Sequence, residues 1–440
     1  MNTAIISQVS QAMQTVLTDV ADELARTSNF IKRQVKVTGS NFCQTLVMGW
    51  LGKPEATLEE LCQTAAAIEL EITPQGLEQR FTEEAANFMK AELEEAIAQV
   101  VQAEAVTIPI LRRFKGVYLT DSSTVSLPNE LSKVWVGCGN GKGGKAALKL
   151  ETRLDMLQGE MDGPLLTDGR TNDRKAARQH TPLPRGSLSI ADLGYWKLAD
   201  LEEKSLNGAY WLSRPQVQTI LYDEWGKRWT LADLMGRQTD DQIDMVILLG
   251  ATYQIPARLI AVRAPQEVAD QRRHKLKKQA RDKGKTVSKA RLALAEWTMF
   301  VTNVPEDKLS VKEVLVLGRM RWQIELIFKL WKSHGQIDKS RSQKPWRILC
   351  EVYAKLIAMI IQHWAFLIAN WSFPDRSLVK AAKTVRQHAL NLAVALADLS
   401  RLERALTILS RCLTVGCRIN KSAKTPRTFQ LLLALDEGIS

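Results

Sequence analysis

The sequence predicts an α/β fold, with a central strand-rich region between two helical regions. Residues 1–105 are rich in Ala and Glu, and their apolar residues recur at helical spacing. From about Phe114 to residue 220, short β-branched or alternating segments are separated by Gly and Pro, which is typical of strands and turns. After Asp307 helical spacing returns, up to about Ser410. Since 440 residues exceed the usual size of one domain, we expect two or three domains.

Capping residues predict two short helices in the N-terminal region. Thr57 is followed three residues later by Glu60, and Thr73 directly precedes Pro74. Two short helices around a turn are typical of a DNA-binding helix-turn-helix. Because the surrounding sequence is acidic, a purely structural helical cap is at least as good an interpretation. The basic residues nearby that could contact phosphate are Lys32, Arg33 and Lys36.

The middle of the chain is expected to supply the strands. Five of them are VYLTDSSTVSLP, AALKLETRLDML, GPLLTDG, SLSIADLGYW and GAYWLSRPQVQ. Between residues 220 and 304, the segments WTLADLM, DMVILLGATY and PARLIAVRAP predict further short strands or extensions. The run QRRHKLKKQARDKGKTVSKAR, residues 271–291, holds ten Lys/Arg and one Asp. Such a run is usually a solvated helix or loop, and an arm that contacts phosphates is about equally favoured.

Several classes of protein are disfavoured by composition. No apolar run reaches the ~18 residues of a membrane span, and residues 356–371, interrupted by Gln362 and His363, predict a buried helix. The N-terminus lacks the pattern of a signal peptide. The six cysteines and five histidines are scattered, which argues against a disulfide framework or a zinc site. We expect a soluble, cytoplasmic protein in which any metal is bound by oxygen.

The distribution of charge favours a polyanionic partner. The net charge is +12, but residues 1–105 hold 7 Lys/Arg against 15 Asp/Glu, so the remaining residues carry +20. A surplus of this size indicates a surface that binds nucleic acid. A basic surface that serves only solubility is the alternative, although +20 exceeds what solubility usually needs.

One motif imitates a nucleotide-binding loop. GNGKGGK, residues 139–145, fits G-x-x-x-x-G-K, but Ala146 follows where the hydroxyl that holds Mg²⁺ is required. The next segment also predicts a strand instead of a helix. We interpret this stretch as a flexible loop near a phosphate backbone and reject nucleotide hydrolysis.

Two aspartates follow predicted strands. Asp121 follows GVYLT, and Asp192 lies in SLSIADLG. Each alone could be a turn former or a helix cap. With a third carboxylate they could bind two metal ions that activate a water or a DNA 3′-hydroxyl. Mg²⁺ prefers such oxygen ligands.

The predicted helix RWQIELIFKLWKS, residues 321–333, offers that third carboxylate. Arg321, Glu325, Lys329 and Lys332 form one polar stripe on an otherwise apolar helix, whose other faces Trp322, Leu326, Phe328 and Leu330 could fill. A surface ladder of ion pairs would contribute only ~0.3–0.5 kcal/mol for each pair. It leaves the apolar faces unexplained, so we favour a stripe that lines a cleft.

Arg321-x3-Glu325-x6-Lys332 also matches three of the four letters of Y-x2-R-x3-E-x6-K. This is the signature of the insertion-sequence-4-type transposases, which the chain resembles from near Phe30 to at least His363. The surrounding segment, VTNVP…LS…RMRWQIELIFKLWKS, is similar to the family's sequences over some thirty residues. The resemblance implies a DDE enzyme with an RNase H-like mixed-sheet core. It also implies that Asp121, Asp192 and Glu325 are the catalytic carboxylates and hold Mg²⁺, for which Mn²⁺ can substitute.

The same resemblance implies residues that contact DNA. Arg321 and Lys332 would hold phosphates, with Lys329 beside them on the stripe. Arg214 in LSRP belongs to the strand after Asp192. The signature tyrosine corresponds to Gly318, so its phosphate contact is absent or comes from elsewhere, and Arg319 is a candidate substitute.

Asp192 and Glu325 are 133 residues apart, which leaves room for the family's β-rich insertion. We expect that insertion at residues 220–304. In relatives a tryptophan of the insertion stacks on a flipped base as the DNA end forms a hairpin, and Trp297 is the matching position. A role for Trp297 as a core residue of a strand is about equally favoured.

The expected domains are 1–105, a helical N-terminal domain; 106–219 with 305–370, the catalytic core; 220–304, the insertion; and 371–440, a helical C-terminal region. The C-terminal region would dimerise or bind the DNA end. Its basic residues are Arg401, Arg404, Arg411, Arg418, Lys421, Lys424 and Arg427.

The resemblance therefore predicts a transposase of a prokaryotic insertion sequence that acts at the nucleoid. Its partners would be double-stranded DNA, at terminal inverted repeats and at the target, and a second copy of the chain; no membrane is expected. Two alternatives stay open. One is a Mg²⁺-dependent RNase H-like nuclease or resolvase, and the other, motivated by Gly318, is a catalytically inactive DNA-binding derivative.

Overall fold

The computed structural model describes residues 3–33, 36–139, 145–173, 181–422 and 426–436. Most of the loop GNGKGGK (residues 140–144) and Lys424 lie outside them. The chain forms two compact units: unit 1 is Met1–Ile108, Asp121–Thr171 and Gln323–Gln430, and unit 2 is Pro109–Thr120, Asn172–Trp322 and Leu431–Ser440. The strands form a mixed sheet of order β3-β2-β1-β4-β5-β10-β9-β8-β6-β7. The α/β prediction is confirmed, while the predicted domain boundaries stay predictions.

Unit 1 is mainly helical. Its strands are β2 (Ala146–Asp155), β3 (Met161–Asp168) and the part of β1 (Val117–Leu127) from Asp121 onward. Its helices are α1 (Thr3–Thr15), the π-helix η1 (Val16–Val20), α2 (Ala21–Thr27), α3 (Gly39–Gly52), α4 (Leu58–Ala67), α5 (Pro74–Glu78), α6 (Glu83–Ala98), the 3₁₀ helix η2 (Asn129–Lys133), α13 (Trp322–Ser333), α14 (Pro345–Ala369), α15 (Leu378–Ala395) and α16 (Leu399–Gly416). A last helix, α17 (Thr428–Asp436), follows in the chain.

The predicted N-terminal helices and their caps are confirmed. The Thr57 side chain accepts from Glu60 N at 3.4 Å while the Glu60 carboxylate accepts from Thr57 N at 2.9 Å, so α4 begins with a capping box. The Thr73 hydroxyl accepts from Gly76 N at the start of α5, with Pro74 as the first helical residue.

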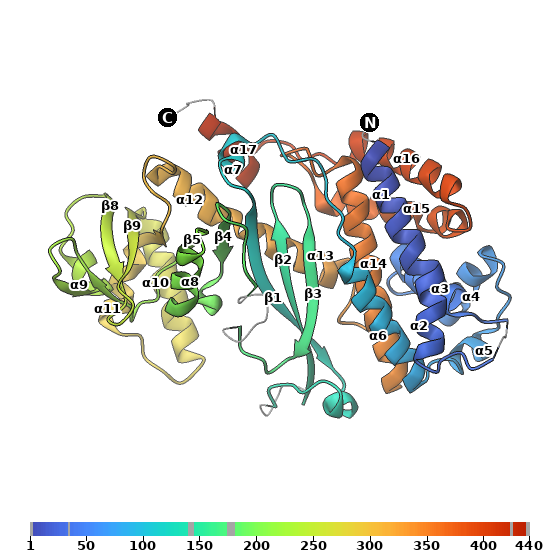
Figure 1. Ribbon diagram of the computed structural model, residues 1–440. Coiled ribbons are helices and arrows are strands. Elements are labelled where there is room, and N and C mark those ends of the chain that lie inside the picture. The colour runs from blue at the N-terminus through green and yellow to red at the C-terminus, as the bar shows by residue number, and fades with distance from the viewer. Residues whose placement is uncertain (1–2, 34–35, 140–144, 174–180, 423–425, 437–440) are drawn as a thin grey trace. The chain divides into compact units, whose positions relative to one another are not determined.

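Helix α14 is the centre of unit 1. It packs against α1, α3, α6 and α16, as Figure 1 shows. Within the described residues it is the one helix long and apolar enough to cross a membrane, yet 94% of its most apolar stretch is buried inside the structure. Gln362 and His363 are buried with their neighbours. The prediction of a buried helix is confirmed.

Unit 2 contains the first part of β1 and the remaining strands. They are β4 (Leu188–Ala191), β5 (Tyr210–Ser213), β6 (Ile220–Tyr222), β7 (Arg228–Thr230), β8 (Gln242–Leu249), β9 (Ile255–Arg263) and β10 (Trp297–Thr302). Its helices are α7 (Pro109–Arg112), η5 (Leu193–Tyr195), α8 (Leu198–Leu206), α9 (Leu231–Gly236), α10 (Gln266–Arg281), α11 (Lys289–Ala293), η6 (Leu294–Glu296) and α12 (Val311–Met320). All five strands predicted before residue 220 are present as β1 to β5.

The pairing in unit 2 changes direction once. β1, β4 and β5 are parallel, with Thr120 opposite Ala191, whereas β10 is antiparallel to both β5 and β9. Strands β8, β6 and β7 continue antiparallel. Behind them lies an apolar core that includes Trp211, Leu221, Leu259 and Val301.

One predicted strand is wrong. In WTLADLM only the first two residues belong to β7, and the chain then enters α9. The Thr230 hydroxyl accepts from Asp233 N at 3.2 Å and so caps this helix. The alternation of the segment was too short to outweigh the cap. The segments DMVILLGATY and PARLIAVRAP form β8 and β9 as predicted.

Candidate active site

Asp121 lies in the middle of β1. Leu119 and Thr120 before it and Val125 after it are buried, whereas Asp121, Ser122 and Ser123 are only half-buried. Ser122 N donates to Asp121 Oδ1 at 2.9 Å, which fixes the carboxylate relative to its own strand. The strand therefore holds an acid and two hydroxyls at one edge of the unit 1 core.

Helix α13 presents the second carboxylate. Its buried residues are Ile324, Ile327, Phe328, Leu330 and Trp331. Glu325 and Lys332 are half-buried and Lys329 is exposed, so the polar stripe predicted from the spacing is present. Trp322 is 53% exposed and fills no apolar face, contrary to the prediction. It lies on the first turn of α13, on a different face from the buried Ile324.

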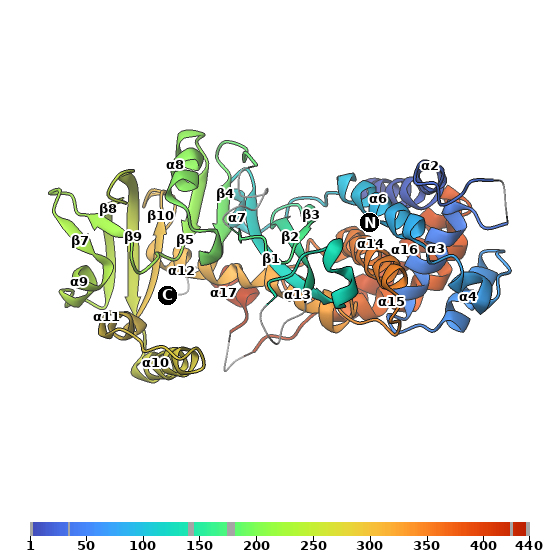
Figure 2. The same ribbon diagram turned by 90° about the horizontal axis from the view of Figure 1, so that it is seen from below.

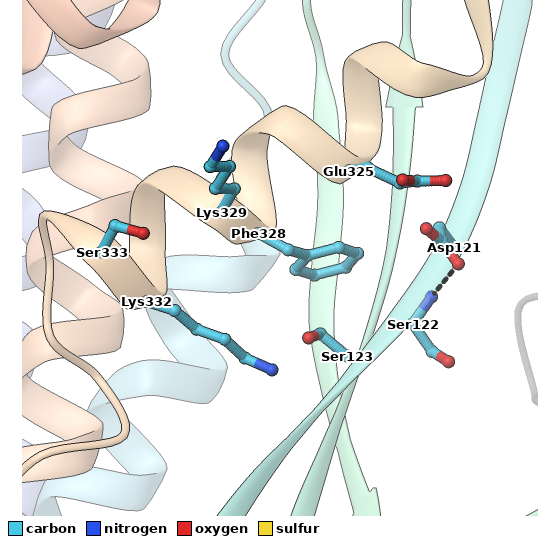
Figure 3. Close-up of a pocket in the computed structure, with 8 residues that line it drawn as sticks. All are labelled: Asp121, Ser122, Ser123, Glu325, Phe328, Lys329, Lys332 and Ser333. Atoms are coloured by element: carbon cyan, nitrogen blue, oxygen red, sulfur yellow. Dashed lines mark hydrogen bonds between the residues drawn. The ribbon is translucent and has the colours of Figure 1, made fainter. Parts of the chain in front are cut away.

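Between β1 and α13 lies a cavity of about 370 Å³, lined by Asp121, Ser122, Ser123, Glu325, Phe328, Lys329, Lys332 and Ser333. In Figure 3 the carboxylates of Asp121 and Glu325 point toward one another. The Lys329 and Lys332 side chains extend from the same helix. Two acids thus face each other beside two cations. The serines were not predicted, although Ser122 and Ser123 directly follow Asp121 in the sequence.

Lys332 has a structural partner. Its Nζ donates to the Thr124 carbonyl at 2.8 Å and so ties α13 to β1. Burial lowers the pKa of Lys332, and the nearby negative charge of Asp338 partly opposes this shift. The ammonium keeps two further N–H groups beside the cavity.

Asp192 belongs to unit 2. It follows β4 directly and is the N-cap residue of η5, with a side chain that is 50% exposed. Arg321 Nε lies 3.8 Å from Asp192 Oδ1, so these two predicted site residues form an ion pair within this unit. In the described residues no group of three or more His, Cys, Asp or Glu is arranged to hold a metal ion. Asp121 and Glu325 line one cavity, and Asp192 is described with the other unit.

The other predicted DNA contacts also lie in unit 2. Arg214 is exposed directly after β5, and Arg319 is exposed on α12. Packing explains why a glycine, Gly318, occupies the position of the signature tyrosine. A Cβ built there would lie 2.2 Å from Cζ of the Phe300 ring, so a larger residue would require Phe300 to move.

Trp297, which the sequence predicts either as a stacking platform or as a core residue, is buried in this structure. Trp297 opens β10, is 6% exposed and belongs to the apolar core of unit 2. The guanidinium of Arg263 lies 4.4 Å from the centre of its ring. This burial favours the interpretation of Trp297 as a core residue, and the stacking role stays a prediction.

Comparison with known proteins identifies a family and several relatives of this chain. Residues 112–361 match the family described as transposase DDE domain. The chain is 26% identical to the transposase for insertion sequence element IS231F of Bacillus thuringiensis subsp. israelensis, over 96% of this chain and 94% of the relative. It is 28% identical to the IS231B transposase of Bacillus thuringiensis subsp. berliner, over 77% and 75%. It is 25% identical to the IS1151 transposase of Clostridium perfringens, over 77% and 76%.

The family match covers more than half of the chain, and it includes the strand with Asp121, the end of β4 and the helix with Glu325. The chain therefore belongs to the transposase DDE domain family, and it is an enzyme that cleaves and transfers DNA.

Proposed function

We propose that this protein is the transposase of a prokaryotic insertion sequence, which cuts at terminal inverted repeats and joins the freed 3′-hydroxyl ends to target DNA. The observation that carries the proposal is the pair of carboxylates, Asp121 and Glu325, facing one another across a cavity that two lysines also line. The IS231 and IS1151 relatives, named as insertion sequence transposases, support it.

The donor set of the cavity suits Mg²⁺. Its polar lining consists of carboxylates, hydroxyls and ammonium groups, with no Cys or His. Hard oxygen ligands favour Mg²⁺ or Mn²⁺ over Zn²⁺. We propose that Asp121, Glu325 and Asp192 hold the metal. Bound Mg²⁺ would polarise the phosphate and activate the attacking hydroxyl.

The placement of Asp192 in this set rests on strand register. β1 and β4 are parallel neighbours, and Thr120 lies opposite Ala191. Asp121 and Asp192 are the next residues along these strands. Both aspartates directly follow the last paired residues of the two strands and are therefore proposed to act at the same end of this paired stretch.

The basic residues would position the DNA. Lys329 is exposed at the cavity and would pair with the phosphate next to the scissile bond. Lys332 would hold α13 against β1 while its remaining N–H groups face the phosphate. Arg321, paired with Asp192 in this structure, together with Arg214 and Arg319, would contact the flanking backbone.

Three finer parts of the proposal come from the family resemblance. We propose an RNase H-like core, cut-and-paste through a DNA hairpin, and a dimer that pairs two ends at the nucleoid. A stacking role for Trp297 in the hairpin step would require its buried ring to be uncovered first.

Glu325→Gln tests the site. The amide keeps the size of the side chain but removes the charge that a metal requires, so Mg²⁺-dependent cleavage of a labelled transposon end should fall at least ~10³-fold. Mn²⁺ binding, followed by electron paramagnetic resonance, should weaken in parallel. The matched control is Glu130→Gln in η2, an exposed acid that does not line the cavity. Unchanged cleavage in Glu325→Gln would refute the assignment.

The wild-type products separate the alternative functions. Strand transfer into a supercoiled plasmid supports the transposase. Cleavage without transfer would instead identify a nuclease or resolvase. Duplex binding with no cleavage in Mg²⁺ or Mn²⁺ would identify an inactive derivative.

A further inference from the structure

The connection between β9 and β10 is far longer than its two ends require. Arg263 and Trp297 are opposite one another in the antiparallel pair, and Ala264 N donates to the Glu296 carbonyl at 2.6 Å. Antiparallel strands whose ends meet in this way are usually joined by two to five residues. Here the connection is residues 264–296, which form α10, a loop, α11 and η6. Its buried residues are Ala269, Leu294 and Ala295, so it adds little to the core.

Arg272 attaches α10 to the beginning of β10. Its guanidinium donates to the carbonyls of Ala295, at 3.3 Å, and Trp297, at 3.1 Å. It also donates to Thr298 Oγ1 at 2.9 Å. Burial lowers the pKa of Arg272, but the pKa of an arginine lies so far above neutral pH that its side chain stays charged. These charge-assisted hydrogen bonds are strong enough to fix the helix.

Arg273 makes the second attachment. It pairs with Asp270 at 2.7 Å, one turn back on α10, and with Glu296 in η6. Ala269 and Leu276 lie on the same face of the helix as the two arginines, at spacings of three and four residues. One face of α10 is thus attached to η6 and to the first residues of β10, and the opposite face is left to solvent. Figure 2 shows α10 standing apart from the strands of this unit.

The exposed residues from 271 to 291 are strongly basic. Residues 271–291 contain ten Lys/Arg, of which Arg272 and Arg273 point inward. The other eight are exposed, and the one acid in the stretch is Asp282. We name these eight the basic arm: Lys275, Lys277, Lys278, Arg281, Lys283, Lys285, Lys289 and Arg291.

We propose that the basic arm binds the phosphate backbone of double-stranded DNA. Within the described residues, the eight cations have no side-chain hydrogen bond or ion pair, whereas Arg272 and Arg273 attach the helix. Concentrated like charge on a helix held by its opposite face disfavours folding unless a polyanion neutralises it. Lys275 to Arg281 span about 9 Å of helix, enough to face two or three phosphates of one strand. This inference rests on the proposed function, because it assigns a surface for the same DNA.

Lysine and arginine contacts to phosphate carry no sequence information, so the arm would bind any duplex. The attachment of α10 through Arg272 and Arg273 presents the four cations on this helix in a fixed arrangement, which lowers the entropy lost on binding. The arm would thus hold DNA that the active site then cuts.

Three lysines of the arm provide the test. In Lys275→Gln/Lys277→Gln/Lys278→Gln, affinity for a random-sequence duplex should fall about 10- to 100-fold. The slope of log affinity against log salt should become shallower by about 2 to 3, one for each lost phosphate contact. Fluorescence anisotropy over a salt series measures both.

A matched triple variant removes the same charge elsewhere. Lys115, Lys133 and Lys383 are exposed lysines on other elements, and their change to Gln should leave the salt slope unchanged. If both triple variants weaken binding equally, net charge alone explains the effect and the proposal is wrong. Full affinity in the arm variant would also overturn it.

Lysine acetylation in wild type gives a direct measurement. Lys275, Lys277 and Lys278 should be protected by duplex DNA, with Lys115 and Lys383 as unprotected references. Equal rates with and without DNA would contradict the proposal. Cleavage of a transposon end tests the proposed function separately. If the basic arm binds DNA but the protein cannot cut it, this inference stands and the proposed function is refuted.

Discussion

Gly318 lies in α12, where any side chain would meet the Phe300 ring of β10. A helix-interior Gly→Ala change usually stabilises by about 1 kcal/mol, because glycine is a poor helix former. Here the new Cβ would lie 2.2 Å from Phe300 Cζ, and overpacking costs about 1–3 kcal/mol. The sign of the stability change in Gly318→Ala therefore shows whether packing against Phe300 or helix propensity has the larger effect at this position.

We predict that Gly318→Ala lowers the melting temperature of the protein. In the Phe300→Leu background the same change should be neutral or stabilising, since the shorter side chain frees the space. A double-mutant cycle measured by thermal unfolding gives the coupling. Stabilisation by Gly318→Ala alone would show that Phe300 yields easily and that packing does not require the glycine.

At the scale of elements, a buried ion pair secures the segment that follows the Glu325 helix. Lys355 on α14 is 1% exposed and donates to the carbonyls of Gln336 and Lys339, at 3.1 and 2.8 Å. Lys355 also forms an ion pair with Glu351 at 2.7 Å. The other carboxylate oxygen of Glu351 accepts a hydrogen bond from Ser340 Oγ. This network fastens the connection between α13 and α14 to the central helix of unit 1.

Lys355→Met should lower the free energy of unfolding by about 3–5 kcal/mol, because Glu351 is left buried without its cation. Lys355→Met/Glu351→Leu should recover part of the loss. Urea unfolding measures both, and Lys383→Met, an exposed lysine on α15, is the control. If Lys355→Met unfolds at the wild-type urea concentration, the pair does not secure the segment.

At the scale of the whole molecule, one buried acid makes stability depend on pH. Glu92 on α6 is fully buried, and neither carboxylate oxygen has a hydrogen-bond partner in the described residues. Burial, assisted by the negative charge of Glu95, raises the pKa of Glu92 from 4.5 to about 8. The folded state thus keeps a proton that the unfolded state releases.

Because the pKa of Glu92 is higher in the folded than in the unfolded state, its contribution to the stability of the folded state is fully present below pH 4.5. This contribution is lost as the pH rises to about 8. We predict that unfolding free energy falls by about 2 kcal/mol between pH 6.5 and 8. Glu92→Gln should remove this dependence. His363, buried against the Gly159 carbonyl with its pKa lowered to about 4, acts with the opposite sign and only below pH 6.5. A flat wild-type profile in chemical unfolding would contradict the prediction.

Local sequence determined the elements of this protein to a large extent. The capping threonines, the five strands before residue 220, the buried helix α14 and the polar stripe of α13 all follow from spacing that a short segment carries by itself. Asp121 and Glu325 could be selected for the same reason, since a charge within an apolar pattern is visible in the sequence.

Tertiary structure decided which faces are covered. Trp297 is enclosed and Trp322 is exposed, although both lie in apolar segments, because burial depends on partners distant in the chain. The Phe300 ring explains Gly318, and the Thr124 carbonyl gives Lys332 a second role. Likewise the basic run became a directed surface only once Arg272 and Arg273 fixed one face of α10 to β10 and η6. Spacing encodes elements because they form from neighbouring residues, whereas contacts between elements depend on how the whole chain packs.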